Sequence, residues 1–396
     1  MDALTTPSNW QRVRLGDVGK PCMCKRVMKH QTTRYGEIPF YKIGTFGNTA
    51  DAFISKKLFL EYKTKYSFPK KGDILISASG TIGRAVIYNG KPAYFQDSNI
   101  VWIDNDETLV KNDFLFYAYS NIKWNTEHTT ILRLYNDNFR NTLIPLPPLN
   151  EQIAIANILS DVDHYLYTLD ALILKKESVK KALSFELLSQ RKRLKGFNQN
   201  WQRVRLGDIA TFLKGKGLSK NQVSPNAKHE CILYGELFTH YDRVVTNIKN
   251  FTNIYDNPML SLNNDVLMPS SGVTPNGLAT ASCILKKGVI LGSDILIIRP
   301  NSNLLNGCFL AYCIVYDKNQ VLSKVVGSTV YHLYAKDMKV FEILLPPLNE
   351  QIAIANILSN VDSEIISLKN KKRQFENIKK ALNHDLMSAK IRVLKK

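Results

Sequence analysis

PPLNEQIAIANILS, at residues 147–160, occurs again without a change at residues 346–359, an offset of 199 residues. A second run, NWQRVRLGD at residues 9–17, recurs at residues 200–208, an offset of 191 residues. Two identical runs in the same order identify an internal duplication. A chain of 396 residues is also long enough for two or three domains. We therefore predict two copies of one unit, each a globular module followed by a helix.

The sequences between these runs, residues 18–145 and 209–344, share only a skeleton. Ser98-Asn99 parallels Ser293-Asp294, and Leu134-Tyr135 parallels Leu333-Tyr334. Short β-branched runs bounded by Gly, Pro and Asn predict strands, and two apolar runs predict a short buried helix in each module. The strands are expected at 74–76, 85–87, 100–103 and 295–298, and the helices at 114–122 and 308–316. The predicted fold class is mixed α/β (α+β), with one scaffold and different loops in the two modules.

Helical periodicity begins after each Pro-Pro pair. In the first copy the apolar residues are spaced by threes and fours, with one polar interruption at Lys176. They are Leu159, Val162, Leu166, Leu169, Leu172, Val179, Leu183 and Leu187, and the second copy has Leu358, Val361, Ile365, Leu368, Phe375, Ile378, Leu382 and Leu386. Asn150 is the expected N-cap and Gly196 the expected C-terminal cap. About 45 residues make a helix roughly 65 Å long.

A long helix with one apolar stripe needs a partner, and the nearest is the other copy. We expect an antiparallel coiled coil with pseudo-twofold symmetry and the modules at its opposite ends. The alternative is that each helix packs only on its own module. The predicted boundaries are 1–149 for the first module, 150–196 for the first helix, 197–348 for the second module and 349–396 for the second helix.

The charge balance indicates a polyanionic partner. The chain has 53 Lys and Arg against 34 Asp and Glu, a formal net charge of +19. Nucleic acid is the most common partner of so basic a protein. The alternatives are that the charge serves solubility or that the protein binds a membrane surface. The sequence shows no secretion signal, no apolar stretch long enough for a membrane span and no disulfide pattern, so we expect a cytoplasmic protein with free thiols and no membrane contact.

No catalytic motif stands out. The phosphate-loop, GxSxG and HExxH patterns are missing, and neither Pro-Pro pair is part of a methyltransferase motif. Cys22, Cys24 and His30 would make half a zinc site, but no second pair follows at a suitable distance. We expect no catalytic residue, no metal and no bound cofactor, with an enzyme of unfamiliar active site as the remote alternative.

Once catalysis is set aside, the function that the sequence indicates is binding. Two basic clusters open the modules and could contact phosphates, although a solvated charged face is the alternative. Polar loops follow the paired strands; there Gln96 and Asn99 could read adenine and Arg84 guanine, whereas the Ser-Gly pieces could be simple turns. The candidate DNA-binding residues are Lys25, Arg26, Lys29, Arg34, Tyr35, Ser77, Ser79, Thr81, Arg84, Gln96 and Asn99 in the first module, and Lys214, Lys216, Lys220, Asn221, Ser270, Ser271, Thr274 and Asn276 in the second.

Two variable modules, each followed by an LPPLNEQ helix start, resemble the specificity (S) subunit of Type I restriction-modification systems. The resemblance covers the whole chain and is carried by residues 146–152 and 345–351, supported by the two entry motifs. It implies that each module is a target recognition domain for one half of a bipartite double-stranded DNA sequence. It also implies that the helices dock two methyltransferase subunits, and we place this contact at Asn150, Glu151, Gln152, Asn349, Glu350 and Gln351.

The resemblance assigns the chemistry to partners. S-adenosylmethionine would bind the methyltransferase subunits, and ATP and Mg²⁺ would bind restriction subunits in the full complex. The sequence does not distinguish a subunit of the full restriction complex from one that works with methyltransferase subunits alone. The alternative from another class is a coiled-coil scaffold whose basic modules bind RNA or protein.

Overall fold

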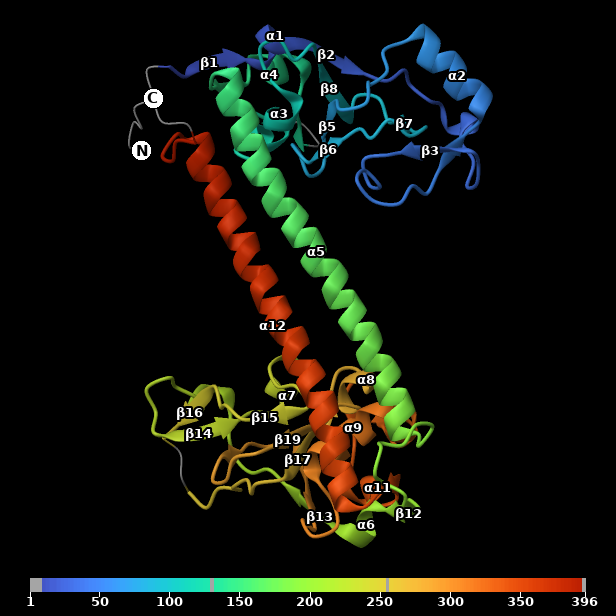
Figure 1. The fold of residues 1–396 in the computed structure, drawn as a ribbon, viewed down its shortest axis with the longest axis vertical. Coiled ribbons are helices and arrows are strands. Elements are labelled where there is room, and N and C mark those ends of the chain that lie inside the picture. The colour runs from blue at the N-terminus through green and yellow to red at the C-terminus, as the bar shows by residue number, and fades with distance from the viewer. Residues whose placement is uncertain (1–8, 129–131, 254–255, 394–396) are drawn as a thin grey trace. The chain divides into compact units, whose positions relative to one another are not determined.

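The computed structural model describes residues 9–128, 132–253 and 256–393 (Figure 1). The chain divides into two compact units. Residues 1–170 and 371–396 form the first, and residues 171–370 form the second. Each unit holds one module together with half of each long helix, so the duplication seen in the sequence is also a structural one.

The first module is mixed α/β, as predicted. Its central sheet has the strand order β2-β8-β5-β6, and a smaller sheet has the order β4-β3-β7. The two-stranded ladders β1-β11 and β9-β10 complete it. The elements are β1 Gln11–Arg14, α1 Leu15–Val18, β2 Gly19–Met23, η1 Lys29–Gln31, β3 Ile38–Tyr41, β4 Phe53–Ile54, α2 Lys56–Lys65, β5 Ile74–Ser77, β6 Ala85–Ile87, β7 Tyr94–Phe95, β8 Ile100–Asn105, α3 Asn112–Tyr119, β9 Glu127–His128, β10 Leu132–Arg133, α4 Asn136–Asn141 and β11 Leu143–Leu146.

The second module repeats this plan. Its main sheet has the order β13-β21-β17-β19-β15, and smaller sheets have the orders β16-β14-β20, β18-β23-β22 and β12-β24. The elements are β12 Gln202–Arg205, α6 Leu206–Ile209, β13 Ala210–Lys214, η2 Lys220–Gln222, β14 His229–Ile232, α7 Glu236–Thr239, β15 Val244–Val245, β16 Asn250–Thr252, β17 Asp265–Pro269, β18 Ser271–Gly272, α8 Pro275–Leu278, β19 Ser282–Ile284, β20 Ile290–Leu291, β21 Ile295–Pro300, α9 Gly307–Tyr316, α10 Lys318–Leu322, β22 Val326–Gly327, β23 Tyr331–His332, α11 Ala335–Lys339 and β24 Glu342–Leu345.

The long helices are α5 (Leu149–Leu188) and α12 (Leu348–Met387), each of 40 residues. Both are shorter than predicted, and two expected caps are wrong. Asn150 lies inside the first turn of α5, and Gly196 lies in a turn beyond its end. The residues that follow each helix in the left-handed conformation are Gln190 and Ala389 instead. At α12 the Lys390 N–H bonds the Asp385 carbonyl (2.9 Å) and the Ala389 N–H bonds the Leu386 carbonyl (3.2 Å), which is a Schellman cap built without glycine.

The helices pair antiparallel in both units. In the first unit Asp163 bonds Lys379 (2.5 Å) and Asp170 bonds Lys372 (2.7 Å). In the second unit Asp362 bonds Lys180. Because Asp362 and Lys379 are the counterparts of Asp163 and Lys180 at the 199-residue offset, the same ion pair occurs twice, as the predicted pseudo-twofold repeat requires.

The seam differs from the predicted stripe near its middle. Leu172, Val179 and Ile378 are 37%, 42% and 50% exposed, whereas Ile173 is only 7% exposed. Lys180 and Lys379 occupy the positions next to these exposed residues and reach the opposite helix with their ammonium groups. Lysines can lie at a helix seam because their alkyl stems pack while the charged ends find carboxylates, so an apolar pattern alone misplaces this part of the stripe.

Each module shares its core with the long helices. In the first unit Ile155 and Leu159 of α5 pack with Phe114 of α3 and with Leu386 of α12. In the second unit the equivalent cluster contains Ile354 and Leu358 of α12, Phe309 of α9 and Leu187 of α5. Each core is therefore closed by the start of one long helix and the end of the other. Among the helices described, none is long and apolar enough to cross a membrane.

Candidate nucleic-acid interface

A basic hollow of about 490 Å³ lies in the first module between the loop after β2 and the loop before β8. Four of the predicted DNA-binding residues line it: Arg26, Lys29, Gln96 and Asn99. Lys42 and Arg133, which the sequence reasoning missed, line it as well. Arg26 is paired with Asp97 at 2.8 Å and keeps two thirds of its side chain in solvent. The hollow therefore gathers cations and amides from four separate segments of the chain.

Asn99 is held in one orientation. Its Oδ1 accepts hydrogen bonds from the Ser79 hydroxyl (2.8 Å) and from Arg133 Nη2 (3.1 Å). Gln96 is held similarly, since its Oε1 accepts from the Ile43 N–H at 2.9 Å. Reading adenine bidentately needs both an acceptor and a donor from the same amide. Because Asn99 Oδ1 already accepts two hydrogen bonds, this geometry offers base edges only the amide N–H groups of Asn99, in contrast to the bidentate expectation. Gln96 Oε1 accepts one bond and keeps a second lone pair.

The turn after β5 holds three further candidates, of which one is buried and two are exposed. Ser77 is 2% exposed, donates its hydroxyl proton to the Thr81 carbonyl and accepts from the Arg84 N–H (3.0 Å). Ser77 therefore stabilises the turn and has no free polar group for a ligand. Its role as a turn residue is favoured over contact with DNA. Thr81 and Arg84 are exposed on the same turn, with Arg84 Nη2 3.4 Å from the Gly47 carbonyl.

The opening basic loop lies beside the hollow. Lys25 is exposed, and its ammonium lies 5.1 Å from the centre of the Tyr66 ring. Arg34 and Tyr35 are exposed further along the chain, with Tyr35 87% in solvent. These side chains are accessible, but they do not line the hollow.

The second module carries the same opening loop. Lys216 and Lys220 stand 191 residues after Lys25 and Lys29, and Lys29 and Lys220 begin matching 3-10 turns, η1 and η2. Both turns have a backbone N–H bonded to a glutamine Oε1 three residues on, at 2.8 Å and 2.9 Å. Asn221 lies in η2, and Lys214 is exposed at the end of β13. The similar placement of the two clusters, expected from the sequence, is confirmed.

At the position of Asn99 the second module has Asp294. The Ala78 N–H bonds the Asn99 carbonyl and the Ser270 N–H bonds the Asp294 carbonyl, both at 2.8 Å, which establishes the equivalence. Ser271 pairs with His332 in β18-β23 as Ser79 pairs with Arg133. Thr274 and Asn276 are exposed at and within α8.

The modules therefore present opposite chemistry at one structural position. Asn99 and Arg133 offer hydrogen-bond donors, whereas the Asp294 carboxylate is an acceptor with no bonding partner among the described residues. Arg133 and His332 directly precede the repeated Leu134-Tyr135 and Leu333-Tyr334, so this repeat was the signal that could have located them.

Four of the six residues expected to dock a partner are buried, which corrects that expectation. Glu151, Gln152, Glu350 and Gln351 are 2% exposed or less. Gln152 bonds the Lys111 N–H and the carbonyls of Leu109 and Pro147, and Gln351 repeats this pattern with Asn306, Leu304 and Pro346. Only Asn150 and Asn349 are exposed.

The buried glutamates each join a tryptophan and an arginine. Glu151 accepts from Trp10 Nε1 (3.1 Å) and from Arg392 Nε (2.7 Å) and Nη2 (3.0 Å). Glu350 accepts from Trp201 Nε1 (3.0 Å) and from Arg193 Nε (3.0 Å) and Nη2 (2.9 Å). A buried carboxylate needs this degree of pairing, so the identical tryptophans and glutamates are explained by contacts inside the protein.

No group of three or more potential metal ligands occurs in the part of the chain that the structure describes. Of the half zinc site suggested by the sequence, Cys24 is 2% exposed, and burial raises the pKa of its thiol to about 12. Metal binding requires the thiolate, which this environment disfavours.

The protein is a duplicated recognition protein, built from two modules of one scaffold. Each module has a basic loop, and the two differ in the polar group at a matched position. The family model for the Type I restriction modification DNA specificity domain matches residues 7–176 and 198–377. These two matches cover most of the chain, and the protein belongs to this family.

Related proteins carry names of the same family. A Haemophilus influenzae protein named as a type I restriction enzyme specificity subunit is 64% identical over 148 residues, which is 37% of this chain and 38% of that protein. The MjaVIII specificity subunit of Methanocaldococcus jannaschii is 27% identical over 417 residues, covering 99% of this chain and 95% of that one. The Type I S subunit from M. genitalium shares the fold with a TM-score of 0.65, at 17% identity and 98% coverage of both chains.

Proposed function

We propose that this chain is the sequence-reading subunit of a Type I restriction-modification complex and that each module reads one half of a bipartite DNA target. The observation that carries the proposal is the contrast at one matched position between Asn99 with Arg133 and Asp294 with His332. One scaffold with exchanged hydrogen-bonding groups is what two different half-sites require. The basic loops around Lys29 and Lys220 supply phosphate contacts.

The chemistry of these groups suggests what each module prefers. Amide and guanidinium donors suit the N7 and O6 acceptors of guanine in the major groove. A carboxylate suits the amino group of cytosine or adenine, because it can only accept. We therefore expect the first module to favour a base-edge acceptor at this position, and the second a base-edge donor.

The long helices would dock two methyltransferase subunits through their exposed faces. Asn150, Ile153 and Asn157 are exposed on α5, and Asn349, Ile352 and Asn356 are their identical counterparts on α12. Ile153 and Ile352 are 46% and 38% exposed, unusual for isoleucine. Two identical surfaces fit two copies of one partner. The chain itself would be non-catalytic: S-adenosylmethionine would bind those partners, and ATP and Mg²⁺ the restriction subunits.

The test is to co-express the chain with its methyltransferase subunit and to map adenine methylation across a genome. A single bipartite motif is expected. Asn99→Asp should change the preferred base at one position of one half-site and leave the other half unchanged. Asp294→Asn is the matched variant and should alter only the other half-site. A continuous motif, or none, would overturn the proposal and favour a scaffold that binds RNA or protein.

A further inference from the structure

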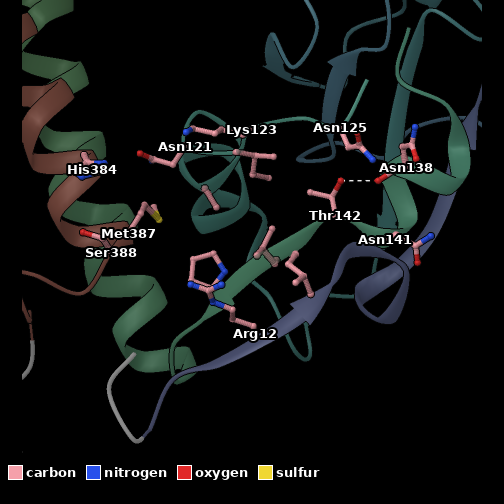
Figure 2. A pocket seen from close by; sticks show the side chains of 15 residues that line it. Arg12, Asn121, Lys123, Asn125, Asn138, Asn141, Thr142, His384, Met387 and Ser388 are labelled. Atoms are coloured by element: carbon pink, nitrogen blue, oxygen red, sulfur yellow. Dashed lines mark hydrogen bonds between the residues drawn. The ribbon is translucent and has the colours of Figure 1, made fainter. Parts of the chain in front are cut away.

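A second hollow lies in the first unit, where the end of α12 meets β1, α3 and α4. Its volume is about 520 Å³. Figure 2 shows His384 and Ser388 of α12 on one side and Asn138 and Asn141 of α4 on the other. Arg12, Lys123 and His384 contribute basic groups, and no acidic residue lines the hollow. Its charge therefore suits an anionic group.

One wall of this hollow is an open strand edge. Leu143 of β11 stands opposite Arg14 of β1, and the Leu15 N–H bonds the Thr142 carbonyl at 2.9 Å. In an antiparallel ladder this makes Arg14 and Leu143 a non-hydrogen-bonded pair, so the N–H and C=O of Leu143 point away from β1. Among the described residues β11 has no other neighbouring strand. Leu143 is 53% exposed and lines the hollow.

The second unit shows what fills the equivalent place. Glu342, the counterpart of Leu143, also points its peptide groups outward, because the Leu206 N–H bonds the Phe341 carbonyl. The side-chain amide of Gln320 pairs with both groups: its Oε1 accepts from the Glu342 N–H (2.6 Å), and its Nε2 donates to the Glu342 carbonyl (3.1 Å). An amide thus closes this strand edge as a neighbouring peptide group would.

The Glu342 carboxylate completes the second site. It lies 3.3 Å from Arg203 and 3.6 Å from Arg205, the counterparts of Arg12 and Arg14. The hollow that remains there has a volume of only about 230 Å³. The first unit has Leu143 in place of the acid, and among its described residues no side chain is hydrogen-bonded to the Leu143 peptide groups as Gln320 is to those of Glu342. It therefore lacks both the carboxylate and the amide that the second unit supplies from within.

We propose that the first hollow binds an extended peptide segment of a partner protein, one that carries an acidic side chain and offers an amide or peptide group to Leu143. The carboxylate would pair with Arg12, and the amide would add to the β11 edge, a recognised mode of peptide binding. A fully ionised phosphate group would satisfy Arg12, but it has no hydrogen to donate to the Leu143 carbonyl, so the open edge favours a peptide. The proposal does not depend on what the modules read.

The test is calorimetric titration of the full chain with the capped peptide Glu-Gln-Glu-Gln-Glu. Saturable binding is expected. Leu143→Glu supplies the missing carboxylate from within and should weaken binding by about tenfold or more, the effect of one charge-assisted hydrogen bond. Arg203→Ala, at the filled site of the second unit, is the matched control and should leave binding unchanged.

Several results would overturn the proposal. They are the absence of saturable binding, equal binding of a Lys-Gln-Lys-Gln-Lys peptide, and an affinity that Leu143→Glu leaves unchanged. Inorganic phosphate that binds as tightly as the peptide and competes with it would show a small-anion site instead. Equal melting temperatures of the wild type and the Leu143→Glu variant exclude misfolding as the cause of lost binding.

Discussion

Arg392→Ala tests the buried glutamate triads most directly. Glu151 is 2% exposed and receives two of its three side-chain hydrogen bonds from Arg392. Removing the arginine leaves a buried carboxylate with only the Trp10 N–H. Breaking a buried pair in this way costs about 3–5 kcal/mol. Because Arg392 is 31% exposed, water can reach the vacated space, and we expect the lower value, about 3 kcal/mol.

A loss of about 3 kcal/mol should lower the melting temperature of a unit of about 200 residues by roughly 6–12 °C. Calorimetry measures this shift, and hydrogen exchange followed by mass spectrometry locates it. In Arg392→Ala, peptides containing Trp10 and Glu151 should exchange faster, while those containing Trp201 and Glu350 should not. Arg193→Ala, in the second triad, should give the opposite pattern.

The matched control is Lys390→Ala. Lys390 lies 3.9 Å from Asp385 and is 45% exposed, so its loss should cost under about 1 kcal/mol. Glu151→Gln introduced into Arg392→Ala should recover part of the lost stability, because an uncharged amide is less costly to bury. Equal melting of Arg392→Ala and Lys390→Ala, or faster exchange in both units, would refute the assignment of these arginines to buried carboxylates.

Three further predictions follow from the geometry. Lys29→Ala and Lys220→Ala should each reduce the salt dependence of DNA binding by about 0.9 in the log-log slope, if each contacts one phosphate; unchanged slopes in filter-binding titrations would exclude the contact. Ile173→Ala should cost about 3 kcal/mol in urea unfolding and Leu172→Ala about 1 or less, and the reverse order would restore the sequence-based stripe. Because burial raises the pKa of Cys24 from 9.0 to about 12, the folded protein should keep this residue as a thiol. The unfolded chain loses the proton at lower pH, so Cys24 should lower the stability of the fold only as pH rises from 9 toward 12. Iodoacetamide at pH 8 should label it only after unfolding.

The duplication made most of the fold predictable. Identical runs at fixed offsets predicted two modules and two long helices, and the repeated Ser98-Asn99 and Ser293-Asp294 pairs marked loops that proved structurally equivalent. The ends of the long helices were not predictable, because capping rules look for glycine and this chain uses Gln190 and Ala389. The position of the seam was wrongly predicted because Lys180 and Lys379 pair with Asp362 and Asp163 across the two helices, which an apolar pattern does not reveal.

The candidate interface was only partly predictable. Clusters such as Lys25 with Lys29 can be recognised along the sequence, and in the structure Lys29 lines the hollow whereas Lys25 does not. Arg133 is far from them in sequence and is brought to Asn99 by a bridge to Ser79. Contacts between distant loops leave no local pattern, so Arg133, the residue that orients the Asn99 amide, can be identified only from the fold.

Identity between the two helix starts does not by itself mark a partner surface. Glu151 and Gln152, and their counterparts Glu350 and Gln351, are retained by bonds within the protein. What remains for a partner is the exposed and equally identical face around Ile153 and Ile352. This face can change without disturbing the core, whereas the buried glutamates cannot.

That distinction yields a last prediction. Ile153→Asp should leave the melting temperature unchanged and reduce the number of methyltransferase subunits per chain from two to one. Ile352→Asp should do the same, and the double variant should retain none, because each surface is expected to hold one copy independently. Native mass spectrometry of the co-expressed complex measures the ratio. Two subunits retained by the double variant would show that the partners dock elsewhere, and a lowered melting temperature would show that these isoleucines support the fold.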